Sequence, residues 1–309
     1  MKRKRWLCML FSCMMLLYGC DDSGGENTPE NSEYPTAYEA SPAKTMEELL
    51  LAESPEIDVV EDKDHIIHMD YSNINLGYVR IKRLLDDDRK IKIQIIKDDQ
   101  KNPYYDLNQT GIYETFPMSF GSGTYQISIF LQNPLTDGYK NIYHNSFEVS
   151  LKTEQSPFLY PNQIVDYDAD TETIHKAFEI VKNDTNDLQR VKTIYEYVVK
   201  NFSYDYDKSK ATQNTYTLPV LDDMLDKGKG ICFDYAAVMA AMCRSQQIPC
   251  RVIVGDTDEY HAWVEVWLKG KGWIDPSILF EAETWTRLDP TYASTKANYD
   301  GEYITKAIY

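Results

Sequence analysis

The stretch GKGICFDYAAVMAAMC, residues 228–243, decides the fold of the second half of this chain, because it predicts a helix with a cysteine at its mouth. From Ile231 to about Gln247 the sequence holds no helix-breaking residue, whereas Pro249 disfavours a helical conformation in the residue before it. The helix is therefore predicted to end at this proline. Cys232 is expected in its first turn.

This position is suited to a nucleophile. Backbone N–H groups and the dipole at a helix N-terminus favour the thiolate, and the same N–H groups can stabilise an oxyanion on an attacked carbonyl. Gly230 would let a substrate backbone approach closely. The alternative is that Cys232 is a small core residue, a common fate of cysteine. Cys243, within the helix, and Cys250, at the start of a predicted strand, fit that alternative better.

A thiolate nucleophile needs a base, and the chain has five histidines. They are His65, His68, His144, His175 and His261. Only His261 lies in the strands after the cysteine helix, within HAWVEVWL (residues 261–268). Alternation places it on one face with two tryptophans and a glutamate, and four apolar residues on the other. This face is typical of a cleft wall and predicts His261 as the base, with a purely structural histidine as the alternative.

Two aspartates are candidates for orienting that histidine, Asp275 in WIDPS and Asp289 in RLDPT. A tight turn at residues 269–271 would pair Asp275 with a residue near Glu265, roughly 13 Å along the strand from His261. Asp289 follows a further insertion that allows the chain to return to the histidine end of the strand. The pairing argument therefore favours Asp289 and leaves Asp275 as the alternative.

The blocks GKGICFDYA, HAWVEVWL and WTRLDPT resemble the three motif blocks of the transglutaminase-like (papain-like cysteine) superfamily, over about residues 165–295. In that family G-x-C-x-x-Y/F-A carries the nucleophile, H-A-W the base and D-P-T the orienting aspartate. The resemblance implies a catalytic triad of Cys232, His261 and Asp289. It also implies a nucleophile helix packed on an antiparallel sheet, and acyl transfer at peptide or amide bonds.

The N-terminus predicts export. A basic MKRKR precedes the apolar WLCMLFSCMMLLYG, which is too short for a comfortable membrane span. The segment ends in LLYGC, which resembles the lipobox of bacterial lipoproteins and implies a signal peptide at residues 1–19 and lipidation of Cys20. An uncleaved membrane anchor is the alternative. Residues 20–45 are rich in Gly, Pro, Ser and acidic residues, which predicts a disordered tether. The protein is thus expected to be membrane-anchored at the bacterial cell surface.

The globular part divides into two predicted domains. Residues 46–155 contain short segments with period-two patterning separated by turn signals, which predicts an antiparallel β-sandwich. Helical periodicity begins near residue 170, and residues 156–309 are assigned to the transglutaminase-like domain. The predicted fold class is therefore α+β, with the sandwich first and the catalytic domain second.

Composition limits the partners and cofactors. A formal charge of −17 argues against nucleic acid as a partner. The cysteines at 232, 243 and 250 are an odd number in the expected mature chain, so at least one thiol stays free. Their spacing contains no C-x-x-C pair, and YDADTE after Asp166 lacks the glycine and glutamate of a calcium loop. We therefore expect no metal and no cofactor.

These patterns predict an exported, lipid-anchored, monomeric cysteine acyl-transfer enzyme that hydrolyses peptide or amide bonds of a protein or peptide substrate. Two alternatives stay open. In one, a primary amine replaces water and the enzyme cross-links proteins in the manner of a transglutaminase. In the other, the protein is a non-catalytic surface binding protein that keeps the fold.

Overall fold

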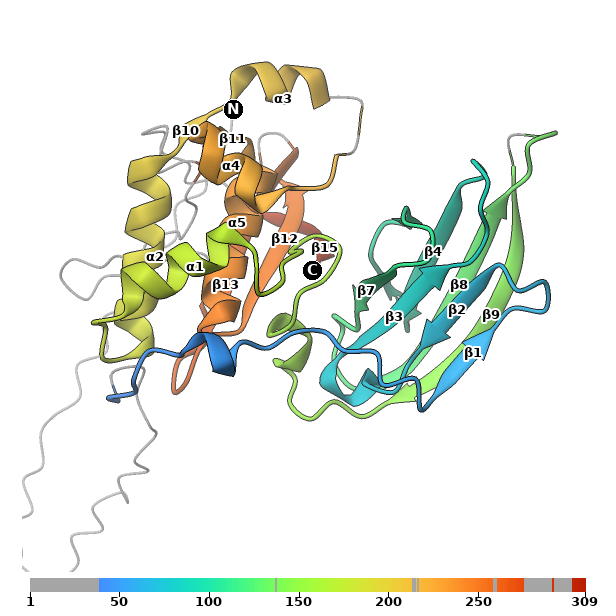
Figure 1. Cartoon of the computed structure of the whole chain (residues 1–309), viewed down its shortest axis with the longest axis horizontal. Coiled ribbons are helices and arrows are strands. Elements are labelled where there is room, and N and C mark those ends of the chain that lie inside the picture. The colour runs from blue at the N-terminus through green and yellow to red at the C-terminus, as the bar shows by residue number, and fades with distance from the viewer. Residues whose placement is uncertain are drawn as a thin grey trace, which may run out of the picture. The chain divides into compact units, whose positions relative to one another are not determined.

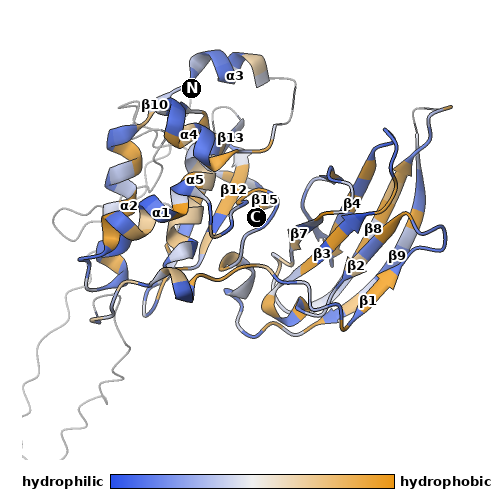
Figure 2. Cartoon of the chain, viewed as in Figure 1, coloured by the Kyte–Doolittle hydropathy of each residue, from blue (hydrophilic) through white to orange (hydrophobic). Residues whose placement is uncertain are grey.

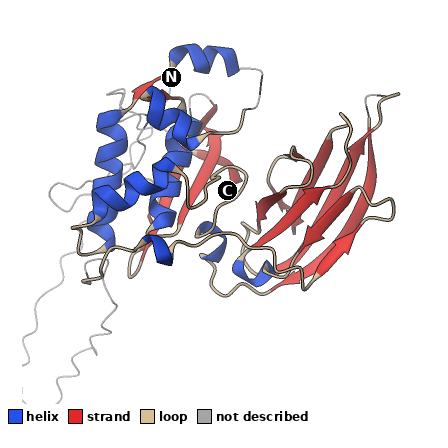
Figure 3. Cartoon of the chain, viewed as in Figure 1, coloured by secondary structure: helices blue, strands red, loops and turns tan. Residues whose placement is uncertain are grey.

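Strands form the first half of the described chain, and helices open the second half (Figure 3). The protein is represented by a computed structural model, which describes residues 39–136, 138–212, 215, 217–257, 260–274, 291 and 302–309. Antiparallel sheets come first, followed by helices and a further antiparallel sheet. This order confirms the predicted α+β class.

Two antiparallel sheets are formed between residues 59 and 149 (Figure 1). The first has the order β1-β2-β3-β7 and consists of β1 (Val59–Glu61), β2 (Ile67–Asp70), β3 (Tyr78–Arg83) and β7 (Tyr113–Pro117). The second has the order β5-β4-β8-β9, with β6 also paired to β4. Its strands are β4 (Ile91–Lys97), β5 (Gln100–Lys101), β6 (Tyr105–Leu107), β8 (Gly123–Gln132) and β9 (Tyr139–Val149).

The alternation in these strands is what places their core. In β4, Ile91, Ile93 and Ile95 are at most 2% exposed, whereas the residues between them are only partly buried. Figure 2 shows the same alternation of hydrophobic and hydrophilic positions along the strands. Burial of one such side chain contributes about 1.5–3 kcal/mol. The sheets are therefore held by the period-two pattern from which they were predicted.

Five α-helices are described after residue 170. They are α1 (Glu172–Val181), α2 (Asp187–Asn201), α3 (Tyr206–Thr212), α4 (Leu221–Lys227) and α5 (Cys232–Ser245). Short 3-10 helices cover Met46–Glu48, Ile74–Leu76 and Ser156–Phe158. The N-terminus of α1 is capped by Asp222 of α4, whose carboxylate accepts hydrogen bonds from the backbone N–H groups of Glu172 (3.1 Å) and Thr173 (2.9 Å).

Helix α5 is the centre of this part of the fold. It contacts β12 (Cys250–Asp256) and β13 (Tyr260–Leu268), and it also contacts α1 and α2. Every residue from Asp234 to its end is buried, as expected for a helix covered by neighbours all round. Cys232 is the first residue of α5, so the predicted start of the helix is confirmed.

The antiparallel sheet that α5 contacts has the order β14-β13-β12-β15. Its edge strands are β14 (Gly272–Ile274) and β15 (Ile304–Ile308). Strand β15 was not predicted, because three of its five residues are exposed and the sequence shows no clean alternation. A Cβ atom at Gly255 of β12 would lie 1.9 Å from the carbonyl oxygen of Ile304. Glycine at this position therefore allows β15 to pair closely. The strand predicted at residues 284–289 lies outside the described residues.

The alternation in SYDYD (residues 203–207) predicts an extended segment, and this is wrong for its second half. Only Ser203–Tyr204 are extended, as β10, which pairs in parallel with β11 (Lys229–Gly230). Helix α3 begins at Tyr206, and the side chain of Asp205 accepts a hydrogen bond from the backbone N–H of Lys208 at 2.9 Å. The alternating tyrosines favoured a strand in the sequence pattern, whereas Asp205 caps the start of a helix.

Asn102, between β5 and β6, forms hydrogen bonds with the backbone of β15. The side chain of Asn102 donates to the carbonyl of Ile308 (2.7 Å) and accepts from its N–H (2.9 Å). Beside it, the rings of Tyr105 and Tyr309 meet edge to face at 5.8 Å. The β-rich part and the part that contains the helices are therefore joined by partly buried hydrogen bonds as well as by ring packing.

A buried arginine links three segments within the second part of the chain. Arg244 of α5 is 0% exposed and donates to the carbonyls of Cys250 (2.8 Å), Tyr160 (2.8 Å) and Tyr309 (3.0 Å). Burial lowers the pKa of Arg244. Three segments distant in sequence thus meet at one guanidinium.

We expect Asn102→Ala to lower the free energy of unfolding by about 2 kcal/mol, because two buried hydrogen bonds to Ile308 are lost at about 1 kcal/mol each. Urea unfolding followed by tryptophan fluorescence measures this. Leu135→Ala, at a position 91% exposed, is the control and should be neutral. An unchanged midpoint in Asn102→Ala would show that the joint contributes nothing.

The described end of the predicted tether contacts the helices. The backbone N–H of Lys44 donates to the side chain of Gln246 (2.9 Å), and Arg190 donates to the carbonyl of Ser41 (2.9 Å).

In the described part of the chain, no helix combines the length and apolar character needed to cross a membrane.

Candidate active site

The approach to Cys232 is fixed by a short parallel pairing. Tyr204 of β10 lies opposite Gly230, and the N–H of Asp205 donates to the carbonyl of Gly230 at 2.9 Å. Ile231 is extended, and Cys232 then opens α5 with a partly buried side chain. Cys243 and Cys250 are both 0% exposed, in agreement with their predicted core role.

Asp234 closes the first turn of α5 behind the cysteine. Its carboxylate is 4% exposed and accepts a hydrogen bond from the N–H of Ile231 at 2.9 Å. Both carboxylate oxygens lie 2.8 Å from Nζ of Lys208 on α3. Lys208 of α3 therefore holds the carboxylate that closes the first turn of α5.

Sequence reasoning missed this pair. Asp234 could have been found from its position, because it is the third residue of α5 and a carboxylate there often accepts a hydrogen bond from the residue before the helix. Lys208 has no local signal. Gly230 was assigned to substrate approach, but a Cβ there would lie 2.9 Å from Cβ of Asp234 and 3.0 Å from Sδ of Met224. The glycine therefore makes room for the Asp234 side chain.

We expect Asp234→Ala to destabilise the protein by about 2 kcal/mol, since it removes a helix cap and leaves Lys208 without its partner. Asp223→Ala is the matched control, because Asp223 forms an exposed ion pair with Lys227 and should cost less than about 0.5 kcal/mol. Urea titrations of the two variants make the comparison. Equal losses would contradict a special role for Asp234.

His261 is the second residue of β13 and lies opposite Gly255. Its ring stacks on Trp263 with centroids 6.4 Å apart and an interplanar angle of 18°. His261 (5% exposed) lines a cavity as expected of a cleft wall, whereas Trp263 (1%) and Glu265 (7%) on the same face are buried and do not line it. Tyr303 covers Trp263 edge to face at 4.8 Å. Both faces of the strand are thus covered over most of its length.

Cys232 and His261 line the same cavity, of about 520 Å³. The other four histidines do not line it. Asp289 and Asp275, the two candidates for the third group, lie outside the described residues. The described hairpin between β13 and β14 pairs Val266 with Ile274, which is the register assumed when Asp289 was preferred. The structure thus places Cys232 and His261 in the wall of one cavity.

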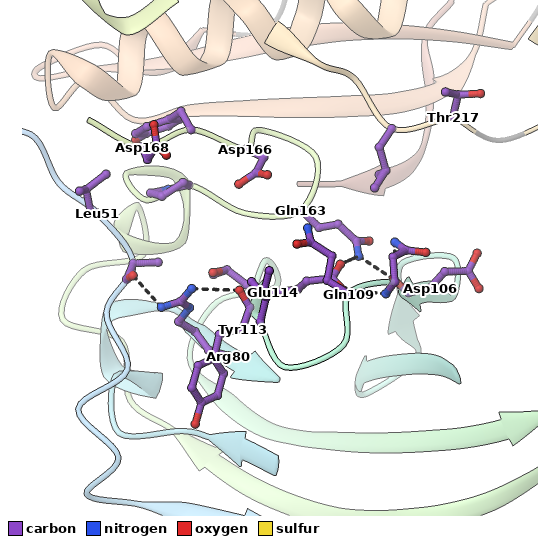
Figure 4. A pocket seen from close by; sticks show the side chains of 17 residues that line it. Leu51, Arg80, Asp106, Gln109, Tyr113, Glu114, Gln163, Asp166, Asp168 and Thr217 are labelled. Carbon is purple, nitrogen blue, oxygen red and sulfur yellow. Dashed lines mark hydrogen bonds between the residues drawn. The ribbon is translucent and has the colours of Figure 1, made fainter. Parts of the chain in front are cut away.

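Figure 4 shows the side chains that line a second cavity, of about 660 Å³. The two share Asp106 and Thr217 in their walls. Partial desolvation and the charges of Asp168 and Glu114 raise the pKa of Asp166, although its side chain is open to solvent. The lining carboxylates and the single guanidinium are Asp106, Glu114, Asp166, Asp168 and Arg80. This cavity is therefore acidic.

Two of the charged groups here, Arg80 and Asp168, form hydrogen bonds within the protein. Arg80 donates to the carbonyls of Ala52 and Tyr113, both at 3.0 Å. Asp168 accepts from the Thr171 hydroxyl at 2.9 Å, as an acid ahead of a helix commonly does. Among the residues that the structure describes, no group of three or more His, Cys, Asp or Glu is placed to hold a metal ion.

Residues 174–276 match the model of the transglutaminase-like superfamily. The matched segment, about a third of the chain, resembles a transglutaminase-like domain. The matched range includes Cys232, His261 and Asp275 but ends before Asp289. No curated protein matches the chain.

Several solved structures resemble the chain. A candidate cysteine protease from Cytophaga hutchinsonii is 16% identical with a TM-score of 0.35, over 75% of this chain and 78% of that one. Red sea bream transglutaminase is 13% identical with a TM-score of 0.27, over 75% of this chain and 58% of that one. A candidate protease from Parabacteroides distasonis is 12% identical with a TM-score of 0.28, over 62% and 38% of the two chains.

Proposed function

We propose that this protein is a cysteine acyl-transfer enzyme that hydrolyses peptide or amide bonds of a protein or peptide substrate. The observation that carries the proposal is the cavity shared by Cys232, at the start of α5, and His261 on β13. A thiol at a helix N-terminus beside an imidazole is the arrangement that nucleophilic acyl transfer requires.

In the proposed mechanism, Sγ of Cys232 attacks the carbonyl carbon and its proton passes to His261. The backbone N–H of Cys232, at the open end of α5, supports the oxyanion. His261 then gives the proton to the departing amine, which leaves a thioester on Cys232. Water, deprotonated by His261, attacks the thioester and releases the acid and the free thiol. Asp289 holds the imidazole in the required tautomer.

The test is to incubate the protein with a peptide library, with and without a fluorescent primary amine, and to identify the products by mass spectrometry. New peptide termini that disappear in Cys232→Ser are the expected result. Amine-modified glutamine side chains would instead indicate cross-linking as the main activity. Products that are the same for both proteins, or no products at all, would favour the non-catalytic binding protein.

We also propose that the protein is exported and held at the bacterial cell surface by a lipid on Cys20. The support is the sequence alone: a basic start, a short apolar stretch and LLYGC before a polar segment. No metal or cofactor takes part in the proposed reaction, and the expected form is a monomer.

Cys20→Ala is expected to yield unlipidated protein that leaves the membrane fraction. Fractionation of cells, with metabolic labelling by a fatty-acid analogue, measures both properties. Membrane retention without label in Cys20→Ala would instead favour an uncleaved anchor.

A further inference from the structure

The cavity at Cys232 has a wall that the transglutaminase-like domain does not supply. Lys92 of β4 and residues 103–106, which lead into and begin β6, line it together with Cys232 and His261. They precede the nucleophile by more than a hundred positions and belong to the β-rich part. This part is therefore placed to influence which substrates reach the cysteine.

The wall carries no unbalanced charge. Lys92 and Asp106 are the only lysine, arginine, aspartate or glutamate side chains among the described residues of the cavity. They form an ion pair with Nζ and Oδ1 2.8 Å apart. A charged substrate group would lose water here without gaining a free partner. The neighbouring acidic cavity differs in this respect.

Aromatic rings face this space from both parts of the protein. Tyr104 is 48% exposed and Tyr260 is 64% exposed, while both line the cavity. Tyr105 and Tyr309 are 3% and 4% exposed and pack against each other, so they form its fixed base. Open tyrosine rings beside a reactive group offer flat apolar surface for stacking. The volume of about 520 Å³ lies within the range of ordinary ligand pockets.

We propose that this cavity receives an uncharged aromatic or large aliphatic side chain, carried by the substrate residue whose carbonyl Cys232 attacks, and that Tyr104 and Tyr260 determine this preference. The proposal rests on the proposed function of Cys232. It assigns the β-rich part a role in substrate selection, because Tyr104 projects from it. The occupant is the side chain of the substrate itself.

The first experiment labels Cys232 in the full-length protein with acetylated amino-acid chloromethyl ketones. The thiolate displaces chloride and forms a thioether, which intact-mass analysis and peptide mapping follow over time. The phenylalanine reagent should react about 10- to 100-fold faster than the alanine, aspartate and lysine reagents. Tyr104→Ala should reduce the ratio of phenylalanine to alanine rates to about threefold or less. Equal rates for all four reagents, or preference for a charged one, would overturn the proposal.

Two controls separate the pocket from the thiol. Leu135→Ala changes a 91% exposed apolar residue of the β-rich part that does not line the cavity, and it should keep the full preference. Iodoacetamide carries no amino-acid side chain, so its rate with Cys232 should be the same in Tyr104→Ala and in the unchanged protein. A general loss of thiol reactivity in Tyr104→Ala would contradict a role in selection.

A second experiment needs no nucleophile. NMR titration of Cys232→Ala with N-acetyl-phenylalaninamide and with N-acetyl-aspartamide compares the two side chains directly. The first ligand should bind at least tenfold more tightly, and Tyr104→Ala in the same background should remove most of the difference. If N-acetyl-phenylalaninamide binds preferentially while no chloromethyl ketone modifies Cys232, the proposed function fails and the proposed side-chain preference of the cavity is supported. If the two ligands bind equally, the pocket proposal fails whatever the activity.

Discussion

Cys232→Ser is expected to lower amide hydrolysis by a factor on the order of 10⁴ to 10⁶, as the loss of a nucleophile does in other triads. A serine hydroxyl is far less acidic than a thiol, so the first turn of α5 and His261 would have to activate a much weaker nucleophile. The side chain is partly buried and changes by one atom. Thermal melting should therefore change little, and initial rates on the best library peptide give the effect on activity.

The other cysteines provide the matched controls. Cys243 is 0% exposed, and its hydrogen bond with Cys250, together with burial, raises its pKa. Cys243→Ser should keep most of the activity while losing about 1–3 kcal/mol of stability, because a hydroxyl is buried in an apolar setting. A Cys232→Ser variant that retains activity, or an inactive but stable Cys243→Ser variant, would assign the nucleophile wrongly.

Asp289→Asn is expected to lower turnover by a factor on the order of 10² to 10⁴, in line with the loss of an orienting aspartate elsewhere. An orienting carboxylate accepts a hydrogen bond from one ring nitrogen while the other nitrogen faces the sulfur, and an amide fails to stabilise the imidazolium. Asp275→Asn should cost little activity, since β14 leaves the hairpin opposite Val266, five positions from His261. Hydrolysis by both variants is measured with thermal melting as the folding control.

Both aspartate variants have to be measured because two observations favour different aspartates. The register of β13 and β14 agrees with the argument for Asp289, whereas the match to the family model includes Asp275 and ends at residue 276. An inactive Asp275→Asn that melts normally, beside an active Asp289→Asn, would assign the acid to residue 275. A lower melting temperature in either variant would indicate that the aspartate replaced in it has a structural role instead.

The elements predicted well from the sequence are those whose signals are local. Helix α5 was located by its glycines, its alanines and Pro249, and strand β4 by strict alternation. Strand β15 was missed because its pairing with β12, through Gly255, is a tertiary contact. Residues at the end of the chain carry no pattern that reveals such a partner.

The candidate site divides in the same way. Cys232 and His261 lie in motif blocks that are short and contiguous, so both could be found. Lys208 binds Asp234 in the first turn of α5, and Tyr104 of the β-rich part lines the cavity. Each depends on how separate segments meet in space, which periodicity does not encode. The burial of both faces of β13 was misjudged for the same reason.

The contact between Asn102 and Ile308 has a consequence for how related sequences should vary. The Asn102 side chain forms hydrogen bonds with the backbone N–H and carbonyl of Ile308. These hydrogen bonds do not involve the side chain of Ile308. Among homologues that keep this joint, selection should therefore retain asparagine at position 102 while allowing position 308 to drift. Covariation between the two positions should be weak even though they touch, so a contact map inferred from co-evolving pairs would overlook this junction.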